Sequence, residues 1–134
     1  MIRVISGLPA ICFALNAFAG VAIYTDSAHP VSSVSSDIPI TYLDAVAKAE
    51  QDLFGRLSAD AAQAEKHARE IVGSPAFIQQ QQRIQDAYQG VIRAWSLGVK
   101  KYPAIVFDDR WVVYGTTDVG LARQYLTNAQ EAKP

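Results

Sequence analysis

The sequence predicts an α/β fold, in which a four-stranded mixed sheet is flanked by helices. Three observations support this prediction. Half of the 134 residues are hydrophobic, which is enough for the core of one domain. Four short runs are rich in β-branched, aromatic and other apolar residues, as strands prefer. Longer stretches between these runs repeat apolar residues at the spacing of an amphipathic helix.

The chain begins with the layout of a secretory signal peptide. Met1–Arg3 is a short positive start, Val4–Phe18 is an apolar run, and Ala17–Ala19 has the small-x-small pattern that precedes a cleavage site. We expect cleavage after Ala19, which leaves residues 20–134 as a single domain. The alternative is a short membrane anchor or a buried helix, but the apolar run is too short to span a bilayer comfortably. These features predict a periplasmic location and no stable membrane insertion of the mature chain.

Cleavage would also remove Cys12, the only cysteine of the chain. A lipid anchor on this cysteine is not expected, because Ile11 stands where a lipoprotein cleavage site has a small residue. The mature chain would hold no thiol, which excludes disulfides, thiol catalysis and cysteine metal sites. The net charge of −1 would become about −2 without Arg3. Lys100-Lys101 is the only adjacent basic pair, so direct binding of nucleic acid is not expected.

Two strands are predicted at the start of the mature chain, Val21–Tyr24 and Ile38–Leu43. Between them, Thr25–Pro30 has the composition of a loop, and Val31–Asp37 is rich in serine and shows little periodicity. Pro39 indicates that the second strand begins there or lies at an edge of the sheet.

Two helices follow these strands. Asp44 can cap a helix over Ala45–Arg56, and Ser58 can cap a second helix over Ala59–Val72. Gly73 then suits the left-handed conformation that often ends a helix. The apolar stripes are Val46, Ala49, Leu53 and Leu57 in the first helix, and Ala61, Ala64, Ala68 and Ile71 in the second.

The longest predicted helix is Pro75–Leu97. Ser74 is its expected N-cap, proline suits its first position, and Gly98 ends it. Its buried face is expected to consist of large apolar residues: Phe77, Ile84, Tyr88, Val91 and Trp95.

A β-hairpin and a final helix complete the chain. Ala104–Phe107 and Trp111–Tyr114 are the hairpin strands, joined by a short polar turn. Thr116 or Thr117 is expected to cap a helix over Asp118–Asn128. Its apolar side is Val119, Ala122, Tyr125 and Leu126. Because a long helical connection separates the second and third strands, we expect the first two strands to run parallel and the last two antiparallel.

His29 is the residue most suited to chemistry, since it lies in a loop close to Asp26 and Ser27. An Asp/Ser/His set invites interpretation as a nucleophile with its base. Residues crowded into one short loop rarely reach the required geometry, however, so turn chemistry stiffened by Pro30 is the simpler interpretation. His67 is the only other histidine, and the carboxylates show no ligand spacing, so no metal site is predicted.

The order of elements, with Tyr102-Pro103 directly before a strand, resembles the thioredoxin-like fold. In that fold a cis-proline precedes the third core strand and lies beside the loop after the first strand. The resemblance implies a cis Tyr102–Pro103 bond that faces Tyr24–Pro30. Redox enzymes of this fold carry Cys-x-x-Cys in that loop, whereas this chain has Asp26-Ser27-Ala28-His29-Pro30.

A closer resemblance covers nearly the whole mature chain. Its blocks are Thr25–Val31, Ala87–Gly98, Tyr102–Phe107 and Trp111–Gly115. Together they resemble an uncharacterised family of integrating conjugative element proteins, which are secreted and thioredoxin-like. The resemblance implies a non-enzymatic periplasmic component of a conjugative DNA-transfer apparatus, similar to type IV secretion, that binds another protein of the apparatus.

The expected partner-binding residues are Asp26, Ser27, His29, Pro30, Tyr102 and Pro103. A cis-proline leaves neighbouring backbone groups able to pair with an extended peptide, as in strand addition. No catalytic residue, metal or cofactor is predicted. Two alternatives remain open: an enzyme of unknown type that uses the Asp26–Pro30 loop, and a chaperone for pilus or channel subunits.

Overall fold

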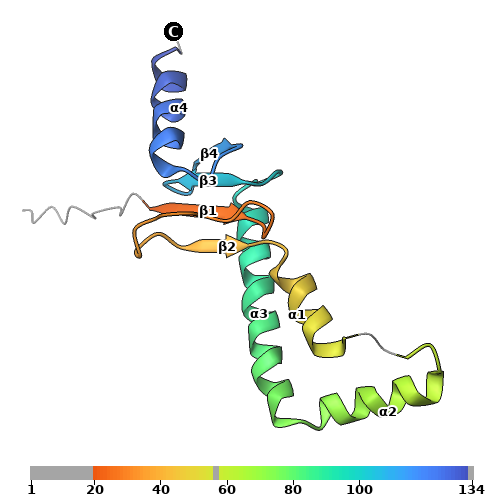
Figure 1. The fold of residues 1–134 in the computed structure, drawn as a ribbon. Coiled ribbons are helices and arrows are strands. Elements are labelled where there is room, and N and C mark those ends of the chain that lie inside the picture. Colours follow the sequence, from red (N-terminus) through yellow and green to blue (C-terminus); the bar gives the residue numbers. More distant parts are fainter. Residues whose placement is uncertain (1–19, 56–57, 133–134) are drawn as a thin grey trace, which may run out of the picture.

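The computed structural model describes residues 20–55 and 58–132 and has an α/β architecture (Figure 1). Its strands form one mixed sheet in the order β2-β1-β3-β4, with β1 parallel to β2 and the other neighbouring pairs antiparallel. The predicted mixed sheet is therefore confirmed. The expected signal peptide, Cys12 and the cleavage position after Ala19 lie outside the described residues. The strands are β1 (Val21–Thr25), β2 (Ile40–Tyr42), β3 (Ala104–Phe107) and β4 (Trp111–Tyr114).

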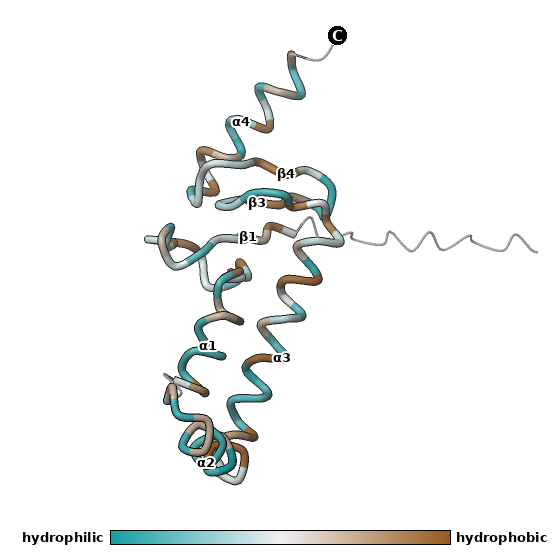
Figure 2. The backbone as a smooth tube through the Cα atoms, turned by 90° about the vertical axis from the view of Figure 1, so that its right-hand side faces the viewer, coloured by the Kyte–Doolittle hydropathy of each residue, from teal (hydrophilic) through white to brown (hydrophobic). Residues whose placement is uncertain are grey.

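Four helices are present in the described parts of the chain, and three of them lie between β2 and β3, as predicted. They are α1 (Ala45–Phe54), α2 (Ala61–Val72), α3 (Pro75–Ser96) and α4 (Val119–Glu131). Figures 1 and 2 show that α4 leaves the sheet on one side, while α1, α2 and α3 extend from the other side as an arm, with α2 farthest away. No described helix is both long and apolar enough to cross a membrane.

The core lies on both faces of the sheet, and β3 runs through its middle. The four residues of β3 are at most 4% exposed. On one face, Tyr24 and Val106 pack with Ala94 from α3. On the other face, Ile23 and other strand residues pack with Ala122 from α4. Because both faces are covered there, β3 is a continuous apolar run and does not alternate with polar residues. In α1 and α2 the structure buries no residue, so these two helices leave the sheet faces to α3 and α4.

The start of β2 lies two residues later than predicted, at Ile40. Pro39 already takes part in pairing through its carbonyl, which accepts a hydrogen bond from Ile23 N at 2.9 Å. As a proline it has no N–H to donate, so the regular ladder begins only after it. The parallel register then runs from Ile23 opposite Ile40 to Thr25 opposite Tyr42.

The caps of α2 and α4 differ from the prediction. Asp60 caps α2 where Ser58 was expected, and Asp118 caps α4 where Thr116 or Thr117 was expected. In both helices the carboxylate accepts a hydrogen bond from the third amide of the first turn at 2.9 Å. The upstream hydroxyls instead accept from the N–H of the capping aspartate. A carboxylate has the further advantage that its charge interacts favourably with the helix N-terminus.

Three other residues stand at the helix ends where they were predicted, but their hydrogen bonds or backbone conformations differ from the prediction. Asp44 precedes α1 without a side-chain cap, because its carboxylate binds Ser27 N. Ser74 precedes α3, but its hydroxyl donates backwards to the Ile71 carbonyl at 2.7 Å. Gly73 has φ −79° and ψ −5°, so the predicted left-handed conformation is wrong. The chain turns directly from α2 into α3 there and keeps a right-handed backbone.

The buried face of α3 consists of small residues, and this corrects the prediction for two aromatic side chains. Trp95 is 83% exposed and Tyr88 is 47% exposed, whereas Ala94 is 3% exposed. At Gly90 the helix passes so close to β2 that an added Cβ would lie 2.6 Å from Thr41 Cγ2. A helix that approaches a strand this closely presents small side chains at the contact, so Tyr88 and Trp95 point away. The other residues predicted for this face are half-buried: Phe77, Ile84 and Val91.

The other predicted apolar faces are confirmed in part. In α4, Ala122 is fully buried and Leu126 is half-buried, but Tyr125 is 51% exposed. In α2, Ala61 is exposed as well. Leu57 of the first stripe lies outside the described residues. The half-buried members of the α1 and α2 stripes are Val46, Ala49, Leu53, Ala64, Ala68 and Ile71.

The hairpin turn places two consecutive aspartates in the left-handed region of the backbone. Asp108 has φ 55° and Asp109 has φ 53°. Arg110 N donates to the Phe107 carbonyl at 3.0 Å, which closes a four-residue turn. Positive φ at both central residues is the signature of the type I′ turn, whose twist matches that of the two strands it joins.

Candidate functional site

The predicted site residues gather at one edge of the sheet, where three chain segments meet. The loop after β1 and the end of β2 lie there together, since Leu43 N donates to the Thr25 carbonyl at 2.8 Å. The start of β3 lies there as well, because Tyr24 pairs with Ala104 and thereby sets Thr25 beside Pro103. The Tyr102–Pro103 peptide bond is cis, as the fold resemblance implied.

Hydrogen bonds hold the loop after β1 in a tight turn. Thr25 is fully buried, and its hydroxyl donates to the His29 carbonyl at 2.7 Å. His29 N donates in turn to Asp26 Oδ1 at 3.0 Å. Asp26 therefore does what turn chemistry predicts for it, which is to accept from a backbone donor three residues later.

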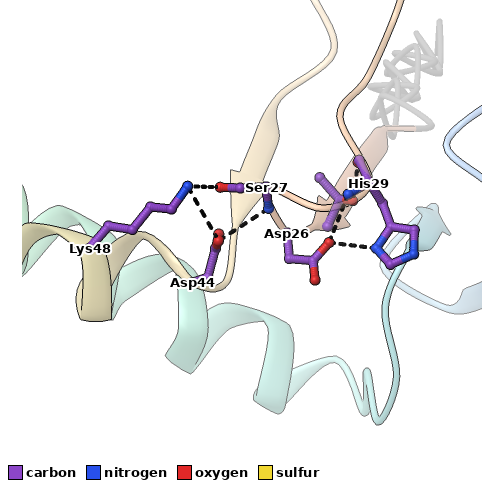
Figure 3. Close-up of polar contacts among 6 residues, drawn as sticks. Asp26, Ser27, His29, Asp44 and Lys48 are labelled. Atoms are coloured by element: carbon purple, nitrogen blue, oxygen red, sulfur yellow. Dashed lines mark hydrogen bonds and ion pairs between the residues drawn. The ribbon is translucent and has the colours of Figure 1, made fainter.

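The His29 ring is held by the same carboxylate. Its Nδ1 lies 2.6 Å from Asp26 Oδ1, and the two side chains are 52% and 16% exposed, respectively. Figure 3 shows this pair at one end of the loop. A carboxylate on Nδ1 orients an imidazole and leaves Nε2 as the nitrogen that faces outward.

A second network joins the loop to the start of α1 (Figure 3). Ser27 N donates to Asp44 Oδ2 at 3.2 Å, and Lys48 Nζ donates to Ser27 Oγ. Lys48 Nζ also lies 3.7 Å from Asp44 Oδ2. The pKa of Asp44 lies below its ordinary value, and the largest cause is a hydrogen bond from the Ser27 side chain. The Ser27 N–H and the Lys48 ammonium lower this pKa further, whereas desolvation raises it.

Sequence reasoning missed Asp44 and Lys48 as members of this site, since Asp44 was assigned only as a helix cap. Two signals were present. The carboxyl ends of parallel neighbouring strands meet at the same edge of a sheet, which brings Asp44 beside the loop after β1. An aspartate four residues before a lysine also places both on one face of a helix.

The two networks separate the residues of the suspected catalytic set. A triad needs the base in hydrogen-bond reach of the nucleophile. His29 binds Asp26, whereas the Ser27 hydroxyl lies with Lys48 and Asp44 in the second network. Lysines that act as bases are buried, and Lys48 is 57% exposed beside a carboxylate, the setting of a structural ion pair. The arrangement presents polar groups at a surface, which suits binding.

Further exposed groups surround the two networks. Tyr102 is 53% exposed, Pro103 is half-buried, and Pro30 is exposed. A groove of about 350 Å³ runs from Ser27 and Lys48 into the space between α1 and α3. Charges of both signs line this groove: Asp44, Lys48, Asp52 and Arg83. Within the described residues, no three histidine, cysteine, aspartate or glutamate side chains gather where they could hold a metal ion.

Comparison with protein families connects this fold and site to one of them. The model of a family described as "Protein of unknown function (DUF1525)" matches residues 18–132. Comparisons with curated proteins and with solved structures found no match. Because the family match spans nearly the whole sequence and all four strands, the chain belongs to the DUF1525 family.

Proposed function

We propose that the protein is a non-enzymatic, periplasmic component of a conjugative DNA-transfer apparatus and that it binds another protein of that apparatus. The observation that carries this proposal is the convergence of exposed polar and aromatic groups at one edge of the sheet. This docking edge comprises the loop after β1 and the residues before β3. Its residues are Asp26, Ser27, His29, Pro30, Tyr102 and Pro103.

The proposal includes a thioredoxin-like architecture. Three features support it: the order β2-β1-β3-β4, the parallel first pair, and the cis Tyr102–Pro103 bond directly before β3. In the redox enzymes that this fold resembles, the surface beside the cis-proline holds the substrate chain. Here the facing loop, Asp26–Pro30, has no thiol. The same surface can then act as a docking site for an extended peptide segment.

The cellular context rests on the sequence. The layout of residues 1–19 supports export to the periplasm. The resemblance of the four sequence blocks to proteins of integrating conjugative elements supports a role in DNA transfer. Deletion of the gene should lower conjugation frequency, and the purified protein should show neither reductase nor isomerase activity. Normal transfer from a clean deletion would contradict the proposal.

The partner can be identified by crosslinking in the periplasm followed by mass spectrometry. Tyr102→Ala should reduce the recovery of the partner, because Tyr102 is a large exposed group of the docking edge. Tyr88→Ala is the matched control, since Tyr88 is similarly exposed but lies on α3. Recovery of assembled apparatus proteins supports the proposal. Recovery of pilus or channel subunits in transit would instead favour the chaperone function.

An enzyme that uses the Asp26–Pro30 loop is the second candidate, favoured by the 2.6 Å contact that orients the His29 ring. His29→Ala separates the two functions, and His67→Ala, in the exposed face of α2, is the matched control. If only His29→Ala abolishes transfer while fold and partner binding persist, chemistry at His29 is supported. Unchanged transfer with His29→Ala would eliminate the enzymatic candidate.

A further inference from the structure

We propose that the outer edge of β4 is a self-association surface, at which β4 pairs antiparallel with β4 of a second copy of this chain about a two-fold axis. This inference is independent of the proposed role in conjugation. β4 stands at the end of the strand order, and within residues 20–55 and 58–132 no strand pairs with its outer side. Its sequence, Trp-Val-Val-Tyr, has no charge and no proline. Natural edge strands carry charged residues or prolines, which prevent pairing with other chains. Because β4 has neither, its outer edge is unprotected.

The backbone of β4 has groups available for a further strand. Gly115, directly after β4, donates its N–H to the residue that precedes β3 at 2.9 Å. Along an antiparallel strand, inward and outward backbone groups alternate from residue to residue. Val113 and Trp111 therefore face β3 with their N–H and carbonyl groups, and Val112 and Tyr114 direct theirs outward, where a second strand can meet them.

The helix α4 provides a cover for that second strand. Figures 1 and 2 both show α4 continuing past β4, beyond the edge of the sheet. Between the overhanging part of α4 and β4 lies a groove of about 470 Å³, lined by all four β4 residues and by Tyr125, Leu126, Ala129 and Gln130. A strand added beside β4 lies under this overhang, so the exposed ring of Tyr125 gains an apolar neighbour.

The side chains of β4 are compatible with a second copy of themselves. A two-fold axis perpendicular to the sheet at this edge leaves corresponding faces of the two sheets on the same side. Each residue of β4 must therefore lie opposite a residue of the second copy whose side chain belongs to the same face. Trp111 and Val113 belong to the face that packs on α4, and Val112 belongs to the opposite face. With Val112 opposite Val112 of the second copy, Trp111 of each chain meets Val113 of the other.

This register places a favourable partner opposite Trp111, Val112 and Val113. Aromatic and β-branched side chains stabilise each other across neighbouring strands. Like charges do not oppose each other, because β4 itself holds no charged residue. The same patch on both molecules is thus self-complementary, as a two-fold interface requires. These pairings and the absence of charge in β4 support a second copy of the chain as the occupant of this edge.

The first test measures the oligomeric state of the protein purified from cells that express the full chain. Sedimentation over the micromolar to sub-millimolar range should show a concentration-dependent dimer. Val112→Pro removes an outward N–H without removing any bond to β3, so it should raise the dimer dissociation constant by about tenfold or more. Val112→Thr keeps the N–H and the branched shape and should remain dimeric. A wild-type monomer at all concentrations would overturn the inference and leave the edge to another protein's strand.

The second test does not require the proline variant to fold. In a Cys12→Ser background, Val112→Cys carries the only thiol of the chain. Residues that face each other across a two-fold axis lie within disulfide reach, so a mild oxidant should crosslink this variant into a dimer. Ser96→Cys, at the exposed end of α3, is the control and should stay monomeric. The pairing would be contradicted if Val112→Cys crosslinked no faster than the Ser96→Cys control. It would also be contradicted if Val112→Pro formed dimers as stable as those of the wild type.

Discussion

At the scale of single residues, one glycine sets how closely the helical arm approaches the sheet. Gly90 in α3 lies against Thr41 in β2, with room for neither a methyl group nor a larger side chain. The same contact explains why Tyr88 and Trp95 face outward, since a helix held this close presents its small residues to the strand. The exposure of Tyr88 and Trp95 is thus a consequence of the close approach that Gly90 allows.

Gly90→Ala should lower the free energy of unfolding by about 1–3 kcal/mol, because the added methyl group collides with Thr41 Cγ2. This loss should exceed the gain of about 1 kcal/mol that alanine brings to a helix. Thr41→Ser removes the colliding methyl group, so Gly90→Ala should become neutral or stabilising in that background. Chemical denaturation of the four variants of this cycle measures the effect. Stabilisation by Gly90→Ala alone would show that α3 and β2 are not in close contact.

The carboxylate of Asp44 should give the protein a measurable acid sensitivity. Its pKa in the folded state lies below the unfolded value of about 3.8, so the carboxylate stabilises the fold above that pH. The contribution is lost as pH falls through the folded pKa. Asp44→Asn should therefore be less stable than the wild type at neutral pH, and its stability should fall less steeply on acidification below about 3.8.

The same assignment can be checked from the other side of the contact. Ser27→Ala removes the side-chain hydrogen bond that lowers the pKa of Asp44 most, so nuclear magnetic resonance titration should find that pKa raised in this variant. An unchanged Asp44 titration in Ser27→Ala would contradict the network of Figure 3.

At the scale of elements, the helix ends show that position in the sequence does not settle how a polar side chain is used. Asp118 caps α4 through a hydrogen bond to the first turn. Ser74 and Asp44 occupy equivalent positions, yet their side chains bind Ile71 and Ser27 outside the helices they precede. A cap forms only where no competing partner lies nearer, and tertiary contacts supply such partners.

Asp118→Ala should lower the free energy of unfolding by about 1 kcal/mol, the usual contribution of a capping side chain. Ser74→Ala is the matched comparison and should cost less, because no helix amide of α3 loses a partner. Thermal denaturation monitored by circular dichroism can rank the two variants. Equal losses, or a larger loss for Ser74→Ala, would show that the serine caps α3 in solution.

At the scale of the whole molecule, the apolar core is confined to the sheet and its two covering helices. The buried apolar residues of the described chain lie in β1, β3, α3, α4 and the loop after α3. Helices α1 and α2 hold none, and Figures 1 and 2 show α2 far from the sheet. Stability should therefore be distributed unevenly along the chain.

Hydrogen exchange measured by mass spectrometry should show this distribution directly. Amides of α2 should exchange fastest among the helices, because local opening there exposes little apolar surface. Amides of β1 and β3 should exchange slowest, since opening them requires disruption of the core. Protection of α2 equal to that of β3 would mean that α2 is stabilised by contacts that the described chain does not show.

The amino-acid sequence by itself determined the local structure of this protein. Strand composition, helical periodicity and glycine and proline positions predicted every strand and helix to within a few residues. They also predicted the mixed sheet, because a long helical connection leads to a parallel strand and a short turn to an antiparallel one. The tight Asp26–His29 turn belongs to this group, since its bonds join residues only three apart.

Only the tertiary structure decided which surfaces meet. Periodicity marks the apolar residues of α3 but does not reveal that Gly90 and Ala94, and not Trp95, face the sheet, because that depends on how closely two distant elements approach. Asp44 and Lys48 lie beside the docking edge for the same reason, through contacts with Ser27 across seventeen or more residues of chain. The overhang of α4 beyond β4 likewise follows from packing and not from any local pattern.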